Sequence, residues 1–324
     1  MKKILVTGAG GFIGSHLTEL LVKEGFGVKA FVRYNGKNDW GWLESSDIKS
    51  EIEVVAGDIR DYDSVLSAVK GCDTVFHLAA LIGIPYSYVS PLAYIRTNVE
   101  GTYNVLEAVR QLDLEQVLVT STSETYGTAQ FVPIDEKHPS VGQSPYSATK
   151  IAADQLADSY YRSFNTPVKI VRPFNTYSPR QSARAIIPTI ITQILSGKFE
   201  LRLGNLDPTR DLTFVKDTAK GFLEIYRSEK TFGEATNIGM NEEISVGDLV
   251  NLIASLLGVD VSVIEDGQRI RTGKSEVERL RCNNAKIKDL TNWSASYNLE
   301  KGLIETIDFL RSNLERYKPE AYNV

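Results

Sequence analysis

A tyrosine and a lysine stand four residues apart at Tyr146 and Lys150, a spacing that places both side chains on one face of a helix. A free phenol has a pKa of about 10, so a tyrosine that acts as a base near pH 7 needs that pKa lowered by roughly three units, or about 4 kcal/mol. A neighbouring ammonium and a positively charged nicotinamide ring can supply this lowering. Surface Tyr–Lys pairs are common, so the context decides. We interpret this pair as catalytic because it follows a glycine-rich turn and five predicted strands.

The glycine-rich turn lies at the start of the chain, with glycines at positions 8, 11 and 14. The apolar run at 4–6 predicts a buried strand before it, and the helix-period segment at 12–21 predicts a helix after it. Gly8 allows the tight turn, Gly11 lets backbone approach a diphosphate, and Gly14 lets the helix pack on the strand. A helix N-terminus stabilises phosphate charge. The sequence therefore predicts a dinucleotide site whose first residues are Gly8, Gly11, Phe12, Ile13 and Gly14.

Strands and helices alternate through the first half of the chain. Further strands are predicted at 28–32, 52–56, 73–78, 117–120 and 168–172, and helices at 62–69, 93–112 and 146–164, with irregular loops at 35–50 and 81–91. This alternation predicts an α/β fold built on a doubly wound parallel sheet, the Rossmann arrangement.

The pattern loosens beyond Pro173, where Pro188 and several glycines interrupt it. We expect strands at 212–215 and 235–238, and helices at 218–227, 249–257 and 299–314. Asp217 is predicted to cap the first of these helices, and Ser245 to open the second. The prediction is a dinucleotide-binding domain of residues 1–174 plus about 212–240, and a smaller mixed α/β substrate domain of about 175–211 and 241–324.

Polar and small residues follow the predicted strands. Arg33 stands where NAD-binding folds often carry an acidic residue; an arginine there can hold a 2′-phosphate and favour NADP, or can be a solvated strand end that leaves NAD acceptable. Asp58 can accept the adenine amino group or can be a plain turn residue. His77 is expected to pack within its strand rather than act as a catalyst. Small residues after it, within Leu78, Ala79 and Ala80, allow a cofactor to approach the backbone.

Composition excludes several classes of function. The 324 residues are 42% hydrophobic and 24% charged, with a net charge of −5, which is typical of an ordinary soluble globular protein and gives no sign of binding to nucleic acid or to an anionic membrane. The two cysteines, Cys72 and Cys282, are far apart, so no disulfide framework and no metal site are expected, and a reducing cytoplasm fits. The start of the chain leads directly into a strand and no apolar run approaches 18 residues, so we expect neither a signal peptide nor a membrane span.

Together these motifs resemble the extended short-chain dehydrogenase/reductase superfamily. The residues that carry the resemblance are Gly8, Gly11 and Gly14, Asp58, the run His77-Leu78-Ala79-Ala80, the segment Thr97–Thr102, Tyr146 with Lys150, and Arg172-Pro173-Phe174-Asn175. The resemblance covers nearly the whole chain. It implies a nucleotide-sugar substrate, a tightly bound nicotinamide cofactor, and a homodimer formed through the helices at 93–112 and 146–164.

The resemblance also assigns roles to individual positions. Thr122 corresponds to a Ser or Thr that hydrogen-bonds the sugar 4-hydroxyl. Further cofactor contacts are expected at Ile59, Asn98, Thr120 and Pro173. Near the nucleotide diphosphate we expect Asn175, Arg180, Arg210 and Arg271, since the planar guanidinium group suits a diphosphate.

The tripeptide Thr122-Ser123-Glu124 indicates the reaction. Sugar-nucleotide 4,6-dehydratases often carry Thr-Asp-Glu here, in which Asp expels the 6-hydroxyl as water and Glu removes the C5 proton. Glu124 matches that pattern and Ser123 departs from it, which leaves the acid open between Ser123 and a bound water. The Thr-Ser-Glu form resembles the NAD-dependent branch that acts on N-acetylglucosamine nucleotides and feeds legionaminic-type sugars. NAD is therefore the expected cofactor, with NADP possible because of Arg33.

The expected reaction is 4,6-dehydration of a UDP-N-acetylglucosamine-like substrate. Tyr146 takes the 4-hydroxyl proton through Thr122, the C4 hydride moves to the nicotinamide, water is lost across C5–C6, and the hydride returns to C6. Three alternatives stay open: a C4 or C5 epimerase, a UDP-glucuronate-type decarboxylase, which also carries Thr-Ser-Glu, and a cofactor-sensing binding protein. The intact Tyr146 and Lys150 speak against the sensor, because a sensor does not need them.

Overall fold

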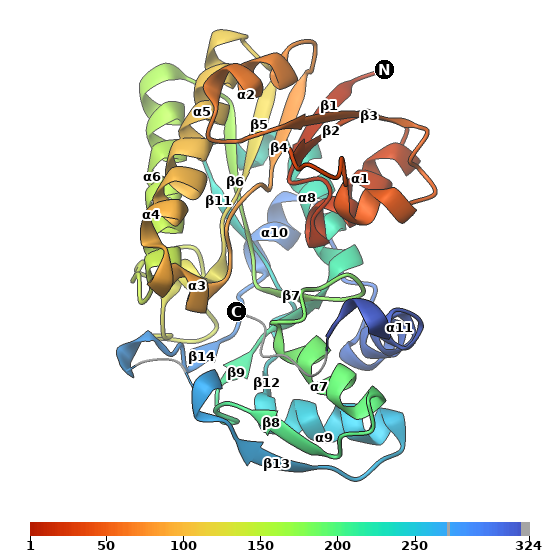
Figure 1. Cartoon of the computed structure of the whole chain (residues 1–324). Helices are drawn as coiled ribbons and strands as arrows, with labels where there is room; N and C mark the ends of the chain where they lie inside the picture. Colours follow the sequence, from red (N-terminus) through yellow and green to blue (C-terminus); the bar gives the residue numbers. More distant parts are fainter. Residues whose placement is uncertain (271–272, 319–324) are drawn as a thin grey trace.

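A seven-stranded parallel sheet of order β11-β6-β5-β4-β1-β2-β3 dominates the computed structural model, which describes residues 1–270 and 273–318 (Figure 1). Its strands are β1 (Lys3–Thr7), β2 (Gly27–Arg33), β3 (Ile52–Gly57), β4 (Thr74–His77), β5 (Gln116–Thr120), β6 (Val168–Pro173) and β11 (Ala235–Ile238). The strand order reverses between β1 and β4, which is the point where a doubly wound sheet opens a crevice for ligands. The predicted Rossmann arrangement is confirmed.

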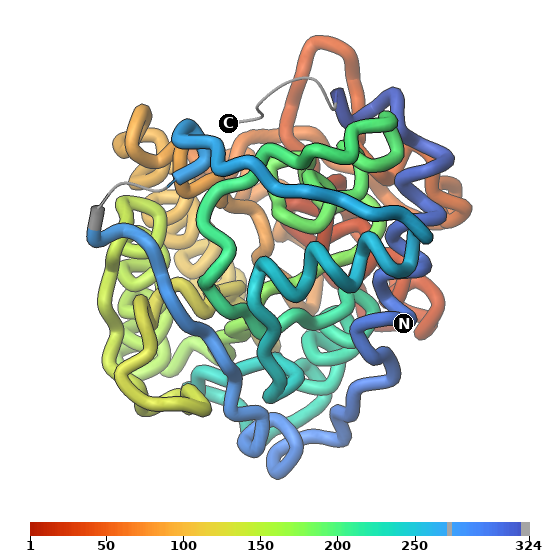
Figure 2. The backbone as a smooth tube through the Cα atoms, turned by 90° about the horizontal axis from the view of Figure 1, so that it is seen from below, coloured from red at the N-terminus to blue at the C-terminus, as the bar shows by residue number. Residues whose placement is uncertain are grey.

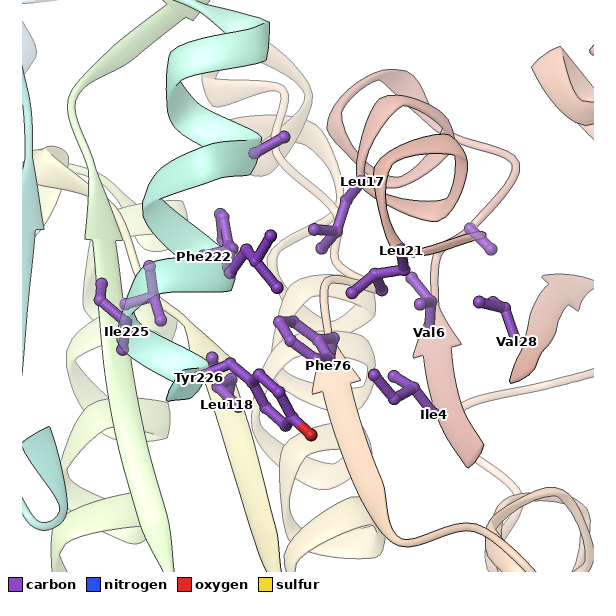
Figure 3. Packing of buried hydrophobic residues seen from close by; sticks show 14 of the residues in the cluster. Ile4, Val6, Leu17, Leu21, Val28, Phe76, Leu118, Phe222, Ile225 and Tyr226 are labelled. Atoms are coloured by element: carbon purple, nitrogen blue, oxygen red, sulfur yellow. The ribbon is translucent and has the colours of Figure 1, made fainter. Parts of the chain in front are cut away.

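Helices cover both faces of this sheet. On one face, α1 (Phe12–Lys23) packs beside α8 (Val215–Arg227), and on the other α2 (Tyr62–Val69) packs on α5 (Gly101–Gln111) and α5 on α6 (Pro145–Phe164). Figure 3 shows the first of these cores, where Phe76 of β4 meets side chains of α1 and α8. The side chains there that are fully or almost fully buried include Ile4, Val6, Leu17, Leu21, Leu118, Phe222 and Ile225.

The predicted loop at 81–91 and helix at 93–112 need correction. The loop contains α3 (Ile84–Val89), whose Pro85 stands in the first turn, where a missing N–H is tolerated. The long helix is divided into α4 (Pro91–Tyr94), a π-helix (Ile95–Glu100) and α5. Within the π-helix, Asn98 is buried and its side chain hydrogen-bonds both backbone polar groups of Leu81 and the hydroxyl of Thr149. The wide turn thus ties the segment after β4 to α6.

The second domain has its own core. Its helices are α7 (Ile186–Leu195), α9 (Val246–Leu257) and α11 (Leu299–Ser312), and they share buried residues that include Ile190, Phe214, Ile253 and Leu303. Three small sheets complete it: β7 (Asn175–Tyr177) with β10 (Leu212–Phe214), β8 (Glu200–Leu203) with β13 (Ser262–Glu265), and β9 (Thr209–Arg210) between β12 (Ile244–Ser245) and β14 (Arg279–Leu280). Helix α10 (Ala285–Leu290) returns to the edge strand β11.

Two local predictions in this half were wrong. Helix α8 begins at Val215, so Asp217 lies in its first turn and is not the cap; its carboxylate instead accepts hydrogen bonds from the backbone N–H groups of Ser296 and Tyr297. Pro188 does not interrupt the chain but lies in the first turn of α7, where it removes no required hydrogen bond. In contrast, Ser245 does open α9, since its hydroxyl accepts from the N–H of Asp248.

Short 3-10 helices connect the larger elements; they are η1 (Gly41–Ser45), η3 (Ser123–Tyr126), η4 (Glu229–Thr231), η5 (Gly267–Arg269), η6 (Gly273–Ser275) and η7 (Leu314–Arg316). Within the described residues, no helix has the length and apolar character needed to cross a membrane.

Candidate active site

A cavity of about 1530 Å³ runs along the carboxyl ends of the sheet strands and continues into the second domain. Ligand sites for one drug-sized molecule span roughly 300–1,000 Å³. This cavity therefore has room for a dinucleotide and a second nucleotide side by side, and its position matches the crevice expected at the carboxyl edge of an open α/β sheet.

Most of the predicted site residues line this cavity. On the dinucleotide side these are Gly8, Gly11, Phe12, Ile13, Gly14, Arg33, Asp58, Ile59, Leu78, Ala79, Ala80, Thr120, Tyr146, Lys150 and Pro173; on the opposite side they are Thr122, Ser123, Glu124, Asn175 and Arg210. Two predictions fail in position. Asn98 is buried behind the wall, where it holds the Leu81 backbone, and Arg180 points to α1, where it donates to Ser15 and Glu19. Arg271 lies outside the described residues.

The tyrosine is held by the start of helix α6. Ser144 and Ser147 form a reciprocal capping box, in which each side chain accepts from the other residue's backbone N–H, so the first turn is fixed. The Tyr146 hydroxyl lies close enough to Thr122 for that side chain to affect its pKa, and its ring meets Tyr94 edge-on with 6.3 Å between centroids. Glu124 follows on η3, whose first N–H groups are satisfied by Thr122. The structure thus brings the predicted catalytic groups to one wall of the cavity.

Burial dominates the electrostatics of Tyr146 and Lys150. Burial raises the pKa of the Tyr146 phenol, although the nearby Thr122 side chain acts in the opposite direction. Burial likewise lowers the pKa of the Lys150 ammonium, which donates to the backbone oxygen of Thr120. Desolvation of both groups therefore dominates, and a lowering of the tyrosine pKa by the ammonium and a nicotinamide ring together stays a prediction. A positive charge brought into the cavity next to the phenol would be needed to favour its ionised form.

A buried ion pair lies directly behind the catalytic tripeptide. Arg172 donates to Asp154 at 2.7 Å, and the two side chains are only 7% and 6% exposed. The same guanidinium also donates to the hydroxyls of Ser121 (3.3 Å) and Tyr126 (2.6 Å). Since Ser121 precedes the tripeptide and Tyr126 follows it, one arginine fixes both ends of residues 122–125.

The dinucleotide side fits the group that the glycines predict. A Cβ atom at Gly14 would lie 2.1 Å from the Gly8 oxygen, and at Gly8 (φ +70°) 2.9 Å from the Ala79 nitrogen, so the turn needs glycine at both places. No side chain caps the N-terminus of α1, whose N–H groups face the cavity side of the turn. Buried side-chain oxygens of Thr120, Asn175 and Gln181 line the same cavity and find no partner within the described residues, as expected of a site that takes a polar ligand.

At the far end of this side, Arg60 forms a bidentate pair with Asp58 and holds the pKa of that carboxyl below its usual range. His77, in contrast, is a packed strand residue as predicted: it is fully enclosed between the hydroxyls of Thr7 and Thr102, and burial lowers its pKa to about 3.

Several lining residues were missed by the sequence analysis. Segment 35–41 contributes Asn35, Lys37 and Trp40 to the lining on the dinucleotide side of the cavity, although the sequence predicts only an irregular loop there. On the second domain, Glu276 lines the cavity and pairs with Arg210 at 3.2 Å, and Arg184 lies against Gly83. Within the described residues, no group of His, Cys, Asp and Glu is arranged to hold a metal ion.

Comparison with known proteins extends these observations. A family model described as GDP-mannose 4,6 dehydratase matches residues 5–306. A putative UDP-glucose 4-epimerase of Methanocaldococcus jannaschii is 30% identical over 96% of this chain and 99% of its own. A UDP-N-acetyl-α-D-glucosaminuronate decarboxylase of Bacillus cytotoxicus is 31% identical over 96% and 98%.

Among solved structures, the dTDP-glucose 4,6-dehydratase DesIV of Streptomyces venezuelae, with NAD and TYD bound, superposes with a TM-score of 0.89 at 27% identity over 98% of this chain and 100% of its own. The predicted cofactor agrees with the NAD bound in that relative. The names of these relatives cover three different reactions, so they fix the family and leave the individual reaction to the residues of the site. The chain belongs to the extended short-chain dehydrogenase/reductase family of nucleotide-sugar dehydratases, epimerases and decarboxylases.

Proposed function

We propose that this protein is an NAD-dependent 4,6-dehydratase of a UDP-N-acetylglucosamine-like nucleotide sugar. The observation that carries the proposal is that Glu124 lines the same cavity as the neighbouring side chains of Thr122 and Tyr146. Dehydration across C5–C6 needs a base for the C5 proton in addition to the group that deprotonates the 4-hydroxyl. Glu124 supplies that second base.

In this proposal each residue moves or holds a proton. Bound NAD would supply the acceptor for the hydride at C4 and the hydride that is returned to C6. Tyr146 accepts the 4-hydroxyl proton through Thr122. Loss of that proton and of the C4 hydride leaves a ketone at C4, and this ketone makes the C5 proton acidic. Glu124 removes the C5 proton and exchanges it with solvent, and the C6 hydroxyl leaves as water after it takes a proton delivered from solvent through Ser123 or a water beside it. Glu124 then returns a solvent proton to C5 when C6 is reduced, while the proton that Tyr146 took from the 4-hydroxyl passes to solvent.

The cofactor and substrate would occupy opposite ends of the cavity. Gly8, Gly11 and the N-terminus of α1 would hold the dinucleotide diphosphate, and Lys150 would hold the nicotinamide ribose. Asn175 and Arg210 would hold the diphosphate of the sugar nucleotide.

The test is incubation of the purified protein with UDP-N-acetylglucosamine in deuterium oxide, followed by mass spectrometry. We expect loss of one water and gain of one deuterium at C5. Glu124→Gln should abolish water loss, while the matched variant Ser123→Ala should keep most of it, because a bound water can replace the hydroxyl.

Other products would refute the dehydratase. A new sugar stereoisomer formed without loss of water would identify an epimerase, with an unchanged mass for inversion at C4 and one added deuterium for inversion at C5. Loss of carbon dioxide from a UDP-glucuronate-type substrate would identify a decarboxylase. Full dehydration by the Glu124→Gln variant would exclude Glu124 as the base.

A homodimer is part of the proposal. The segment that runs through α3, α4, the π-helix and α5 leaves large apolar side chains in solvent: Val89 (74% exposed), Leu92 (56%), Ile95 (50%) and Tyr103 (45%). Clustered exposure of this kind is typical of an interaction surface. Sedimentation should give twice the chain mass, and Ile95→Lys should yield the monomer.

A further inference from the structure

The connection between β2 and β3 lies directly on the glycine-rich turn. We call residues 39–46 of this connection the clasp. The Trp42 N–H donates to the Gly10 oxygen at 3.0 Å. A Cβ atom at Gly10 would lie 2.2 Å from the Trp40 oxygen, and one at Gly41 (φ +67°) would lie 2.3 Å from the Gly10 oxygen. The two backbones are therefore in direct contact, at a distance that only glycine on both sides permits.

The clasp is anchored in the dinucleotide-binding domain. Leu43 is completely buried in the core beneath α1. The Ser46 hydroxyl donates to Glu19 of α1 at 2.6 Å, and Asp39 accepts from the Gly41 N–H at 2.6 Å. The clasp is therefore held along its length by side-chain contacts with the dinucleotide-binding domain, and not only at its two ends.

The Trp42 side chain reaches the other domain. Its ring meets Phe309 of α11 edge-on, with 5.7 Å between centroids, and the Arg316 guanidinium of η7 lies 5.4 Å from the ring centroid. Figure 2 shows this C-terminal part of the chain (dark blue) beside the orange connection that follows β2. Trp42 therefore contacts the glycine turn through its backbone N–H and helix α11 of the second domain through its ring.

We propose that Trp42 is a positioning residue that slows release of the dinucleotide, and that it does so through its contact with α11. The turn at Gly10 and Gly11 borders the place of the cofactor diphosphate, and Trp40 lines the same end of the cavity. While the clasp rests on Gly10, the turn cannot move outward, so the dinucleotide leaves only when the clasp detaches. The contact of Trp42 with Phe309 and Arg316 opposes that detachment.

Slow release suits chemistry in which the hydride is taken and returned within one turnover, because no exchange of cofactor is then required. The inference rests on dinucleotide binding in this cavity and is independent of which sugar reaction follows. A failure of the dehydratase assay therefore leaves it intact, and a failure here leaves the dehydratase proposal intact.

The experiment measures dissociation of NADH. The protein is loaded with NADH, mixed with excess NAD⁺, and the loss of bound NADH fluorescence is followed. Trp42→Ala should release NADH roughly 5- to 70-fold faster, the range expected for loss of both an aromatic pair and a cation–π contact. Phe309→Ala should accelerate release by a similar factor, the double variant no more than Trp42→Ala alone, and Trp42→Phe much less. Phe199→Ala removes an exposed aromatic side chain elsewhere in the second domain and is the control, with an unchanged rate.

Two results would overturn the inference. Release at the wild-type rate from Trp42→Ala would show that the clasp does not retain the dinucleotide. Fast release from Trp42→Ala with wild-type release from Phe309→Ala and Arg316→Ala would show that the second domain takes no part. Because Arg316 is exposed, its variant tests the contact even if Phe309→Ala unfolds, and thermal melts identify that case.

Discussion

Replacement of Asp154 by asparagine should be among the most damaging single changes away from the cavity surface. The change keeps the size of the side chain and leaves the Arg172 guanidinium, which is 7% exposed, without its counter-charge. Breaking a buried ion pair by removing one partner costs about 3–5 kcal/mol. For 324 residues with an unfolding entropy of roughly 2.1 cal/mol/K per residue, this corresponds to a melting temperature lower by about 4–7 °C.

A matched control is available one turn further along α6. Asp158 pairs with Arg162, whose side chain is 72% exposed, so Asp158→Asn should change the free energy of unfolding by at most about 0.5 kcal/mol. Urea denaturation of both variants gives the comparison directly. Asp154→Asn should also lower kcat, because Arg172 holds Ser121 and Tyr126 at the two ends of the catalytic tripeptide.

The reasoning would be refuted if Asp154→Asn unfolded within about 1 kcal/mol of wild type. It would also be refuted if removing both charges, in Asp154→Leu with Arg172→Met, were as destabilising as Asp154→Asn alone. The double variant is expected to recover most of the lost stability. It should recover none of the lost kcat, because no arginine then donates to Ser121 and Tyr126 at the two ends of residues 122–125.

Three further predictions test separate parts of the site. Tyr146→Phe should lower the turnover rate about 10²- to 10⁴-fold, with bound NAD retained on gel filtration. Arg210→Ala should raise KM for the nucleotide sugar about 10- to 100-fold with an unchanged NAD content, since it removes a charge-assisted contact, and Arg210→Lys should lie between the two. Burial lowers the pKa of His16 to about 4, so between pH 6.5 and 4 the imidazole binds a proton in the unfolded chain but not in the folded protein. The free energy of unfolding, measured by urea denaturation, should therefore decrease as the pH falls through this range, by at most about 1.4 kcal/mol per pH unit. His16→Gln should reduce that dependence on pH.

Each of these has a clear contrary result. Wild-type turnover in Tyr146→Phe would remove the phenol from the mechanism. Loss of NAD from Arg210→Ala would place that arginine on the cofactor. An unchanged pH slope in His16→Gln would mean that this imidazole is solvated in the native protein.

The dinucleotide half was predictable because each of its signals is local. Gly8, Gly11 and Gly14 encode their turn within seven residues, and Tyr146 with Lys150 encode a shared helix face within five. In this part the predicted strands agree with the structure to within two residues at either end.

What could not be predicted depends on contacts distant in sequence. Arg180 lies against α1 because it donates a hydrogen bond to Glu19, 161 positions earlier in the chain. The Asp217 carboxylate accepts hydrogen bonds from backbone N–H groups about 80 positions later. The desolvation of Tyr146 could not be predicted for a related reason: spacing shows which charges are neighbours, whereas desolvation depends on everything packed around them. Segment 35–41 has no hydrophobic period, because its order comes from Gly10 and Asn35 rather than from a core.

The strand at the far edge of the large sheet comes from late in the chain. β11 (Ala235–Ile238) pairs with β6, and α8, which supplies Phe222 to the first core, precedes it by only a few residues. In a shortened protein that stops near residue 174, the backbone N–H and C=O groups of β6 would have no neighbouring strand on one side, and Phe76 would be exposed to solvent. Such a protein should aggregate. During synthesis, the cofactor half likewise cannot close until about 238 residues have left the ribosome, by which time only the 175–211 part of the second domain, which includes α7, has emerged.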